Sequence, residues 1–176
     1  MNSNRMVIDH VADITRTALG LNSPIELQEL CDAIEKYLPG HCEAVSNDKL
    51  KVDAAINTSD NDNNEEVSFV IRYRDDRPKV RVLFSIAHEL GHLFFDLLEK
   101  DGKLKASTEM QRDMSSSQNE LIANEYAGAF LMPENEFIVK CREYTDHNRV
   151  NITLLSRHFN VSEQAVTVRG NVLGLW

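Results

Sequence analysis

The chain has 176 residues, 42% of them hydrophobic, and a formal net charge of −9 at pH 7, which suits one domain with one core over residues 1–176. The negative charge argues against a protein that acts mainly on the phosphate backbone of nucleic acid, because like charges repel. No apolar stretch approaches the roughly 18 residues of a membrane span, and three widely spaced cysteines without an apolar leader indicate a reduced, cytoplasmic protein.

Two helices are expected at the N-terminus. The apolar residues of the first recur at helical spacing: Val7, Val11, Ile14 and Ala18. In the second helix, Ser23 and Pro24 are typical of an N-cap and first-turn residue, and apolar positions continue to the stop at Pro39-Gly40. Neither helix carries evident chemistry.

The pattern then changes to two short strand-like pieces, residues 50–56 and 67–73, joined by a polar run. They predict a small antiparallel sheet. The polar run resembles the start of a calcium-binding loop, but Glu65 stands where that loop needs glycine and Ile71 where it needs glutamate. We interpret it as a solvated connection.

A densely apolar segment from Val80 to Leu98 predicts a buried central helix. After a polar connector, a further helix is expected from about Asn119 to Met132, and Pro133 can begin a short helix through Arg142. The tail, at about residues 151–173, resembles two short helices joined by a turn. The sequence therefore predicts a mainly helical α+β fold with a small antiparallel sheet and a C-terminal helical hairpin.

The central helix contains an H-E-x-x-H motif at residues 88–92, so His88 and His92 lie one turn apart on the same face. Two neutral imidazoles and one carboxylate suit Zn²⁺ and leave a fourth position for water, as in a catalytic site. Zinc lowers the pKa of water to about 7, so Glu89 can accept its proton as general base. The alternative, two core histidines at this spacing by chance, is rare at ordinary composition.

The third ligand must come from elsewhere in the chain. A metzincin would need glycine at position 95 and histidine at position 98, where this chain has Phe95 and Leu98. Several carboxylates remain as candidates: Asp96, Glu99, Glu109, Asp113, Glu120 and Glu125. Asp96 lies one turn past His92, where it could bind the metal or orient a histidine.

Glu120 is the strongest of these candidates because it opens a helix with small residues on the same face, which can pack closely on the histidine helix. An ordinary acid at a helix N-terminus is the alternative. Asn124, one turn later, could accept a hydrogen bond from a liganding histidine and set its tautomer. The sequence thus predicts Glu89 as the base and, as metal ligands, His88, His92 and Glu120.

In two stretches the chain resembles the ImmA/IrrE family of metallopeptidases. Residues 81–92, RVLFSIAHELGH, match the family's F-x-x-A-H-E-x-G-H core, and residues 120–133 match its E-x-x-A-N-x-[FY]-A helix running into L-M-P. Weaker similarity covers the helix after Ser23-Pro24 and the tail from Phe159 to Val166. Many relatives carry a second acid where this chain has Ile122, which removes a rival ligand to Glu120.

The resemblance implies a zincin-like fold and a gluzincin-type zinc endopeptidase. Its implied activity is the site-specific cleavage of a helix-turn-helix transcriptional repressor, often encoded beside the peptidase on a prophage or integrative element. Such cleavage makes the enzyme an anti-repressor. The net charge of −9 is compatible with gripping a basic DNA-binding protein.

Two other classes of protein compete with this interpretation. Residues 154–172 could form a DNA-binding helix-turn-helix, but its reading helix offers only Arg169 against Glu163, which favours a structural hairpin and makes nucleic acid an unexpected partner. Alternatively, zinc could be structural in a regulatory protein that binds a repressor or DNA without cutting it. Glu89 argues against this, because a structural site fills all four metal positions and needs no base.

Overall fold

The computed structural model describes residues 3–46, 49–60, 67–99 and 117–176. Within these residues the elements, in chain order, are α1 (Ser3–Leu19), α2 (Leu27–Tyr37), β1 (Gly40–Val45), β2 (Ala54–Asp60), β3 (Val67–Arg74), α3 (Lys79–Glu99), α4 (Ser117–Leu131), α5 (Glu134–Glu143), β4 (Thr145–Asp146), β5 (Arg149–Val150), α6 (Ile152–Phe159) and α7 (Glu163–Val172). The mainly helical α+β fold predicted from the sequence is confirmed.

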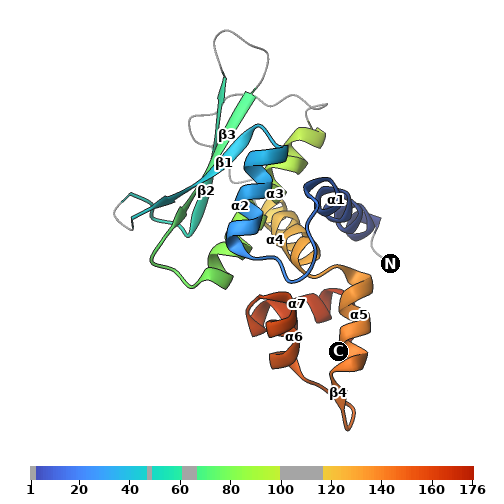
Figure 1. The fold of residues 1–176 in the computed structure, drawn as a ribbon. Helices are drawn as coiled ribbons and strands as arrows, with labels where there is room; N and C mark the ends of the chain where they lie inside the picture. The colour runs from blue at the N-terminus through green and yellow to red at the C-terminus, as the bar shows by residue number, and fades with distance from the viewer. Residues whose placement is uncertain (1–2, 47–48, 61–66, 100–116) are drawn as a thin grey trace.

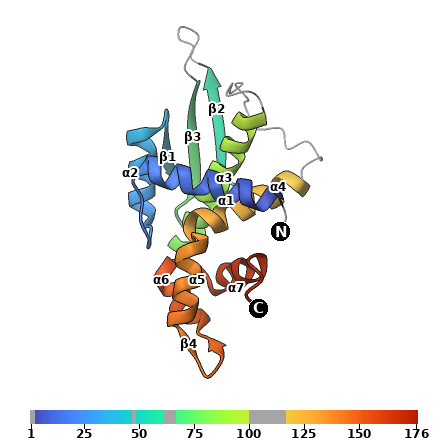
Figure 2. The same ribbon diagram turned by 90° about the vertical axis from the view of Figure 1, so that its right-hand side faces the viewer.

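Helix α3 lies between the sheet and α4; α2 packs against α3, and α1 packs against α4 (Figure 1). The last three helices, α5 to α7, gather below these elements and form what we call the C-terminal lobe, residues 134–172 (Figure 2). The two short helices expected in the tail are therefore present. The predicted central helix and the helix that follows the polar connector also match α3 and α4.

The buried face of α1 differs from the predicted one. Val7 and Ile14 are exposed, whereas the residues one position later, Ile8 and Thr15, are buried. This face could not be recognised from hydrophobicity, because it contains polar residues, including Arg16. The Arg16 guanidinium donates a 2.6 Å hydrogen bond to a carbonyl of α4. A buried arginine with a satisfied donor can occupy a face that hydrophobicity alone would assign to solvent.

The predicted start of α2 is wrong. The helix begins at Leu27 and its N-cap is Glu26, whose backbone N–H donates to the Glu29 carboxylate at 3.4 Å. Ser23 lies in the preceding turn, where the Ser23-Pro24 peptide is cis. Its hydroxyl donates to Glu136 at 2.8 Å, so it ties the turn to the C-terminal lobe instead of capping α2.

The sheet has the strand order β1-β3-β2. Strands β2 and β3 pair antiparallel, as the sequence predicts, but β1 pairs with β3 in parallel. The sheet is therefore mixed, which corrects the purely antiparallel expectation. Strand β3 lies between β1 and β2, and the strand that begins at Gly40 has the same direction as β3. Of the polar run, residues 61–66 lie outside the described part of the chain.

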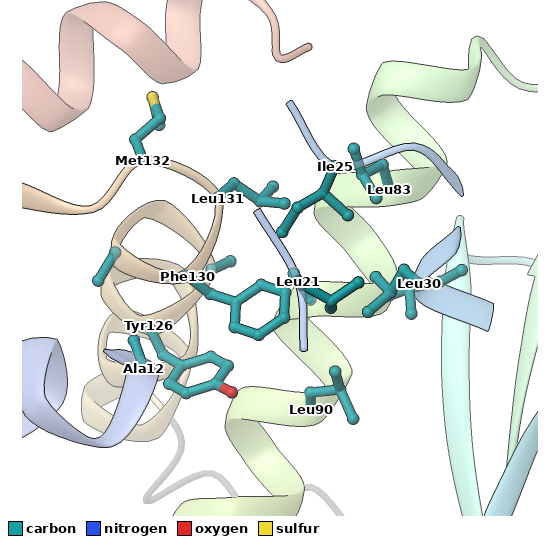
Figure 3. Close-up of a cluster of buried hydrophobic side chains, with 14 of the residues drawn as sticks. Ala12, Leu21, Ile25, Leu30, Leu83, Leu90, Tyr126, Phe130, Leu131 and Met132 are labelled. Carbon is teal, nitrogen blue, oxygen red and sulfur yellow. The ribbon is translucent and has the colours of Figure 1, made fainter. Parts of the chain in front are cut away.

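The core forms where α3 and α4 face each other across the segment that joins α1 to α2. Figure 3 shows Tyr126 and Phe130 of α4 pointing toward Leu90 of α3, with Leu21 between the two helices. All four side chains are buried. Burying side chains of this size stabilises the fold by about 1.5–3 kcal/mol each, which fixes α4 against the helix that carries the histidines.

Candidate metal centre

Helix α3 places His88 and His92 one turn apart with their ring nitrogens converging. The two Nε2 atoms lie 2.9 Å apart, and the ring centroids are separated by 4.6 Å in a T-shaped arrangement. Both side chains are partly buried, with 15% and 13% of their surface exposed. The i, i+4 spacing on one helix face produces this convergence without any unusual backbone.

Helix α4 brings Glu120 to the same point from its first turn. Its Oε2 lies 3.3 Å from Nε2 of His88, and its Oε1 lies 3.3 Å from Nε2 of His92. One ligand atom from each residue lies within 4.8 Å of the other two. Among the described residues, these three side chains form the one group of three or more His, Cys, Asp or Glu residues that could hold a metal ion.

Gly91, between the two histidines, allows α4 to approach this closely. A Cβ atom at this position would lie 3.0 Å from a ring carbon of Tyr126 and 3.1 Å from the Ala123 Cα. Such contacts are tighter than most real Cβ contacts, so the two helices meet at a glycine–alanine crossing. The small residues around the motif therefore set the distance from the histidines to Glu120.

Asn124 lies one turn after Glu120, and its Oδ1 is 3.0 Å from Nδ1 of His88. The amide oxygen is an acceptor, so the Nδ1–H of His88 donates to it. A neutral His88 then carries its lone pair on Nε2, the nitrogen that faces Glu120. The tautomer that this contact favours is the one that can ligate a metal.

Glu89 is buried, with 4% of its surface exposed, and one of its carboxylate oxygens accepts a hydrogen bond from the Ile56 backbone N–H at 3.2 Å. Strand β2 thus orients the carboxylate next to the first histidine. This contact spans 33 residues of sequence, and no local pattern of residues pointed to it. Ile56 is the residue of this site that sequence reasoning missed.

Two of the other acidic candidates fall on described residues and lie outside the cluster of three. Asp96 and Glu125 are half-buried, and neither joins the group formed by His88, His92 and Glu120. Glu109 and Asp113 lie outside the described residues, as does the side chain of Glu99. Among the described acids, Glu120 is therefore the carboxylate that the fold brings to both histidines.

Three further residues carry a hydroxyl or imidazole that could stabilise a reaction oxyanion if it lay at the cluster. Tyr126 is fully buried and stacks on Phe130, and its burial raises the pKa of its hydroxyl. Tyr144 packs against His158 in the C-terminal lobe. His147 is 94% exposed in the turn beside β4, at the far end of α5 from α3 (Figure 1). The geometry assigns none of these three to the cluster.

The C-terminal hairpin of α6 and α7 uses its arginine internally. Arg169 is 3% exposed, and its guanidinium donates to the Met132 carbonyl at 3.0 Å and to Asp9 of α1 at 2.7 Å. Asn160, between the two helices, donates from its amide to the Ile25 carbonyl at 3.0 Å. These contacts bind the hairpin to the rest of the chain and leave Arg169 unable to reach a phosphate or a base.

Among the described residues, no helix is both long and apolar enough to cross a bilayer.

Comparisons with known proteins bear on the fold and on the family of the chain. Among solved structures, the chain is similar to one titled "Mycobacterium tuberculosis transcriptional regulator", with a TM-score of 0.63 and 21% sequence identity over 92% of this chain. The match covers 45% of that protein, so this chain spans less than half of its length, and the likeness shows the fold. No curated protein gives a significant sequence match. The family model for the IrrE N-terminal-like domain (Peptidase_M78) matches residues 49–171, which include His88, Glu89, His92 and Glu120, and the chain therefore belongs to this metallopeptidase family.

Proposed function

We propose that the chain is a zinc-dependent endopeptidase that cleaves a helix-turn-helix transcriptional repressor of a prophage or mobile element, in the cytoplasm. The observation that carries this proposal is the convergence of His88, His92 and Glu120 beside a buried glutamate. Family membership supports the peptidase class. The choice of zinc as the metal and of a repressor as the substrate goes beyond family membership and is part of this proposal.

The donor set fits zinc. Two imidazole nitrogens and one carboxylate are the ligands of a catalytic zinc site of the His₂Glu kind, whereas calcium and magnesium prefer an all-oxygen set. The three side chains already lie within one ion's reach of each other. Asn124 holds His88 in the tautomer that presents Nε2, as expected for a residue that supports a metal ligand.

When bound, zinc supplies Lewis-acid activation of water, whose pKa it lowers to about 7. Glu89 then accepts the proton of the attacking water, because it follows the first ligand directly in the helix. The Ile56 N–H holds one oxygen of this carboxylate, which limits its rotation. The same carboxyl group can later give its proton to the leaving amine, so one residue serves both steps of peptide hydrolysis.

The proposed substrate rests on family resemblance and on charge. A chain with a net charge of −9 attracts a basic DNA-binding protein and repels the DNA itself. The buried Arg169 also argues against DNA binding by this chain, because the arginine of its helix-turn-helix-like hairpin makes internal contacts. DNA binding is therefore expected of the substrate and not of the peptidase.

The test compares wild type and Glu89→Gln, both loaded with zinc, in cleavage of a helix-turn-helix repressor encoded by a neighbouring gene. We expect Glu89→Gln to keep one zinc per chain and to lose cleavage by about 10²-fold or more, because a general base is removed. Glu143→Gln, an exposed acid of α5 that pairs with Lys140, is the matched control and should cleave normally. Equal cleavage by wild type and Glu89→Gln would reject the mechanism.

A second arm separates catalysis from binding. If wild type holds zinc, forms a complex with the repressor and leaves it intact, the chain is a binding protein with a structural metal. If a chelator abolishes cleavage and added zinc restores it, the metal takes part in the reaction. Repressor cleavage that persists after complete metal removal would contradict the proposed cofactor.

A further inference from the structure

Helix α4 ends just before a proline, and its last carbonyl groups need donors from outside the helix. Pro133 has no N–H, so it cannot donate to the Ala129 carbonyl, as the next residue of a continuing helix would. The last turn of α4 also contains no basic side chain of its own that could bind these carbonyls.

Two arginines from other helices supply the donors. The Arg16 guanidinium of α1 donates to the Phe130 carbonyl at 2.6 Å, and the Arg169 guanidinium of α7 donates to the Met132 carbonyl at 3.0 Å. The arginines lie 114 and 37 positions away from these carbonyls in the sequence. Figure 3 shows Phe130 and Met132 at the end of α4. Two elements that are distant in the sequence therefore meet at this one helix end.

Both arginines are buried, with 7% of Arg16 and 3% of Arg169 exposed. Burial lowers the pKa of Arg16, because the charged form loses hydration, and acidic neighbours, Glu136 first among them, act in the opposite direction. Arg169 pairs with Asp9 at 2.7 Å. Burying two cations costs free energy, which the acidic partners and the negative end of the α4 dipole offset.

The opposite end of the same helix carries the metal ligand Glu120. Phe130 is ten residues further along, which corresponds to about 15 Å in a helix. Helices α3 and α4 cross where Gly91 meets Ala123, about 4.5 Å from Glu120 and about 10.5 Å from Phe130 along the axis. A rotation about this crossing that moves Phe130 by about 1 Å would move Glu120 by about 0.4 Å. Sliding of α4 along its axis would move Glu120 by the full distance.

Apolar packing alone restrains such movements weakly. It determines which faces of α3 and α4 meet, but it is non-directional and tolerates small slides. A hydrogen bond from a charged donor, in contrast, weakens steeply when its length or angle changes. The contacts of Arg16 and Arg169 therefore restrain the axial position of α4 more sharply than the apolar core does. A metal site needs its ligands placed within about 0.5 Å, which is the size of the displacements derived above.

We propose that Arg16 and Arg169 are positioning residues for the metal site, because they bind the C-terminal carbonyls of α4 and thereby set the place of Glu120 at its other end. The inference rests on the zinc site proposed above. Both arginines act through the backbone of α4. Helix α1 and the C-terminal lobe thus belong to the support of the site, although neither contributes a member of the cluster of three.

The test replaces each arginine by glutamine, which keeps an amide donor but loses the charge and the second guanidinium contact. Zinc affinity is measured by competition with a chelator, under conditions in which circular dichroism shows every variant to be fully folded. We expect Arg16→Gln and Arg169→Gln each to bind zinc about 10-fold more weakly than wild type, because a displaced ligand weakens the site. Arg16→Lys restores the charged donor and should stay within about 3-fold of wild type. The visible spectrum of the Co²⁺-loaded protein, which reports ligand geometry, should change in both glutamine variants.

A control of reduced stability separates positioning from folding. Phe159→Leu removes part of a buried ring that stacks on Phe137 inside the C-terminal lobe, and it leaves both arginines in place. This variant should unfold more easily but bind zinc, and give the cobalt spectrum, as wild type does. The proposal is overturned if the glutamine variants match wild type in both measurements, or if Phe159→Leu loses as much zinc affinity as they do.

A measurement on the metal-free protein keeps this result separate from the proposed function. The nitrogen NMR shifts of the His88 ring report whether Nδ1 carries the proton that Asn124 of α4 accepts. We expect this tautomer in wild type and a mixture of tautomers in Arg16→Gln and Arg169→Gln, because a displaced α4 carries Asn124 with it. If wild type binds no zinc, the proposed cofactor fails and this measurement still decides the positioning. An unchanged His88 tautomer in both glutamine variants overturns the positioning and leaves the peptidase proposal standing.

Discussion

The metal cluster and the C-terminal hairpin both carry sequence patterns associated with a function, yet they use their charged side chains in opposite ways. At the cluster, Glu120 and two histidines point at one another and leave their ligand atoms grouped for an ion. In the hairpin, Arg169 points into the protein and donates hydrogen bonds to Asp9 and to a backbone carbonyl. The first arrangement is available to a ligand and the second is not.

The difference teaches that a sequence motif indicates function only where the fold brings its polar atoms together at a point that a ligand can reach. Polar atoms that are bound to other parts of the same chain are not available to a ligand. Burying an arginine costs free energy that only good partners can offset, and Arg169 has such partners. The cluster, in contrast, gathers two imidazoles and a carboxylate whose ligand atoms lie within 4.8 Å of one another. Four substitutions can break or sharpen this comparison, beginning with the one that should have the largest effect.

Removing a metal ligand should have the largest effect. His92→Ala deletes one of three donors, so we expect zinc affinity to fall by more than about 100-fold, beyond the loss expected for a supporting residue. The melting temperature of the zinc-loaded protein should also fall, because metal binding is coupled to folding. Metal analysis after dialysis and a thermal melt measure both effects. His147→Ala, at an exposed histidine, is the control, and the comparison breaks if both variants bind zinc equally.

Arg169→Ala addresses the other side of the comparison. Removing the guanidinium leaves the Met132 carbonyl without this donor and leaves Asp9 with Arg5, at 3.5 Å, in place of its 2.7 Å partner, so the free energy of unfolding should fall by about 3 kcal/mol. Arg157→Ala, at an exposed arginine of α6, should change it by less than about 0.5 kcal/mol. Chemical denaturation measures both. A hairpin that contacts DNA through Arg169 would instead show unchanged stability and weaker DNA binding in the Arg169→Ala variant.

Asn124→Ala tests whether the cluster is oriented as well as assembled. Without the Asn124 oxygen, His88 loses the contact that favours its Nε2 lone pair, so zinc affinity should fall by about 10–100-fold. Asn119→Ala lies in the exposed first turn of the same helix and serves as the control for helix propensity. Zinc titration by calorimetry measures the two values. An unchanged affinity in Asn124→Ala would remove this residue from the metal site.

Much of this comparison was predictable from the sequence where the signal is local. The H-E-x-x-H spacing places two histidines on one face of a helix whatever the rest of the chain does, and α3 follows the predicted bounds within one residue. The small residues after Glu120 also pointed to close helix packing. Periodicity failed at α1, because the buried face includes Thr15 and Arg16 and only their tertiary partners make that burial favourable.

Long-range pairs were beyond the reach of the sequence. The Ile56 N–H that holds Glu89 belongs to a strand whose place in the sheet no local pattern of residues indicates. Strand β1 was not predicted, so its parallel pairing with β3 was not predicted either. A single sequence records which residues are adjacent in the chain, whereas these contacts are set by the three-dimensional packing of separate elements.

Two glycines, Gly91 of α3 and Gly128 of α4, provide the most closely matched test, with the smallest change in the side chain. Gly91→Ala puts a Cβ atom 3.0–3.2 Å from Tyr126 and from the Ala123 backbone, and a neighbouring helix cannot move away without disturbing the core. The free energy of unfolding should therefore fall by about 1–3 kcal/mol, and zinc should bind more weakly because α4 carries Glu120 away from the histidines. Gly128→Ala meets only the Arg169 Cδ, at an ordinary 3.9 Å, so the gain in helix propensity should raise stability by up to about 1 kcal/mol with zinc binding unchanged. Denaturation and zinc titration of the two variants decide the matter. If Gly91→Ala is as stable and binds zinc as tightly as Gly128→Ala, close contact between α3 and α4 does not set the geometry of the cluster.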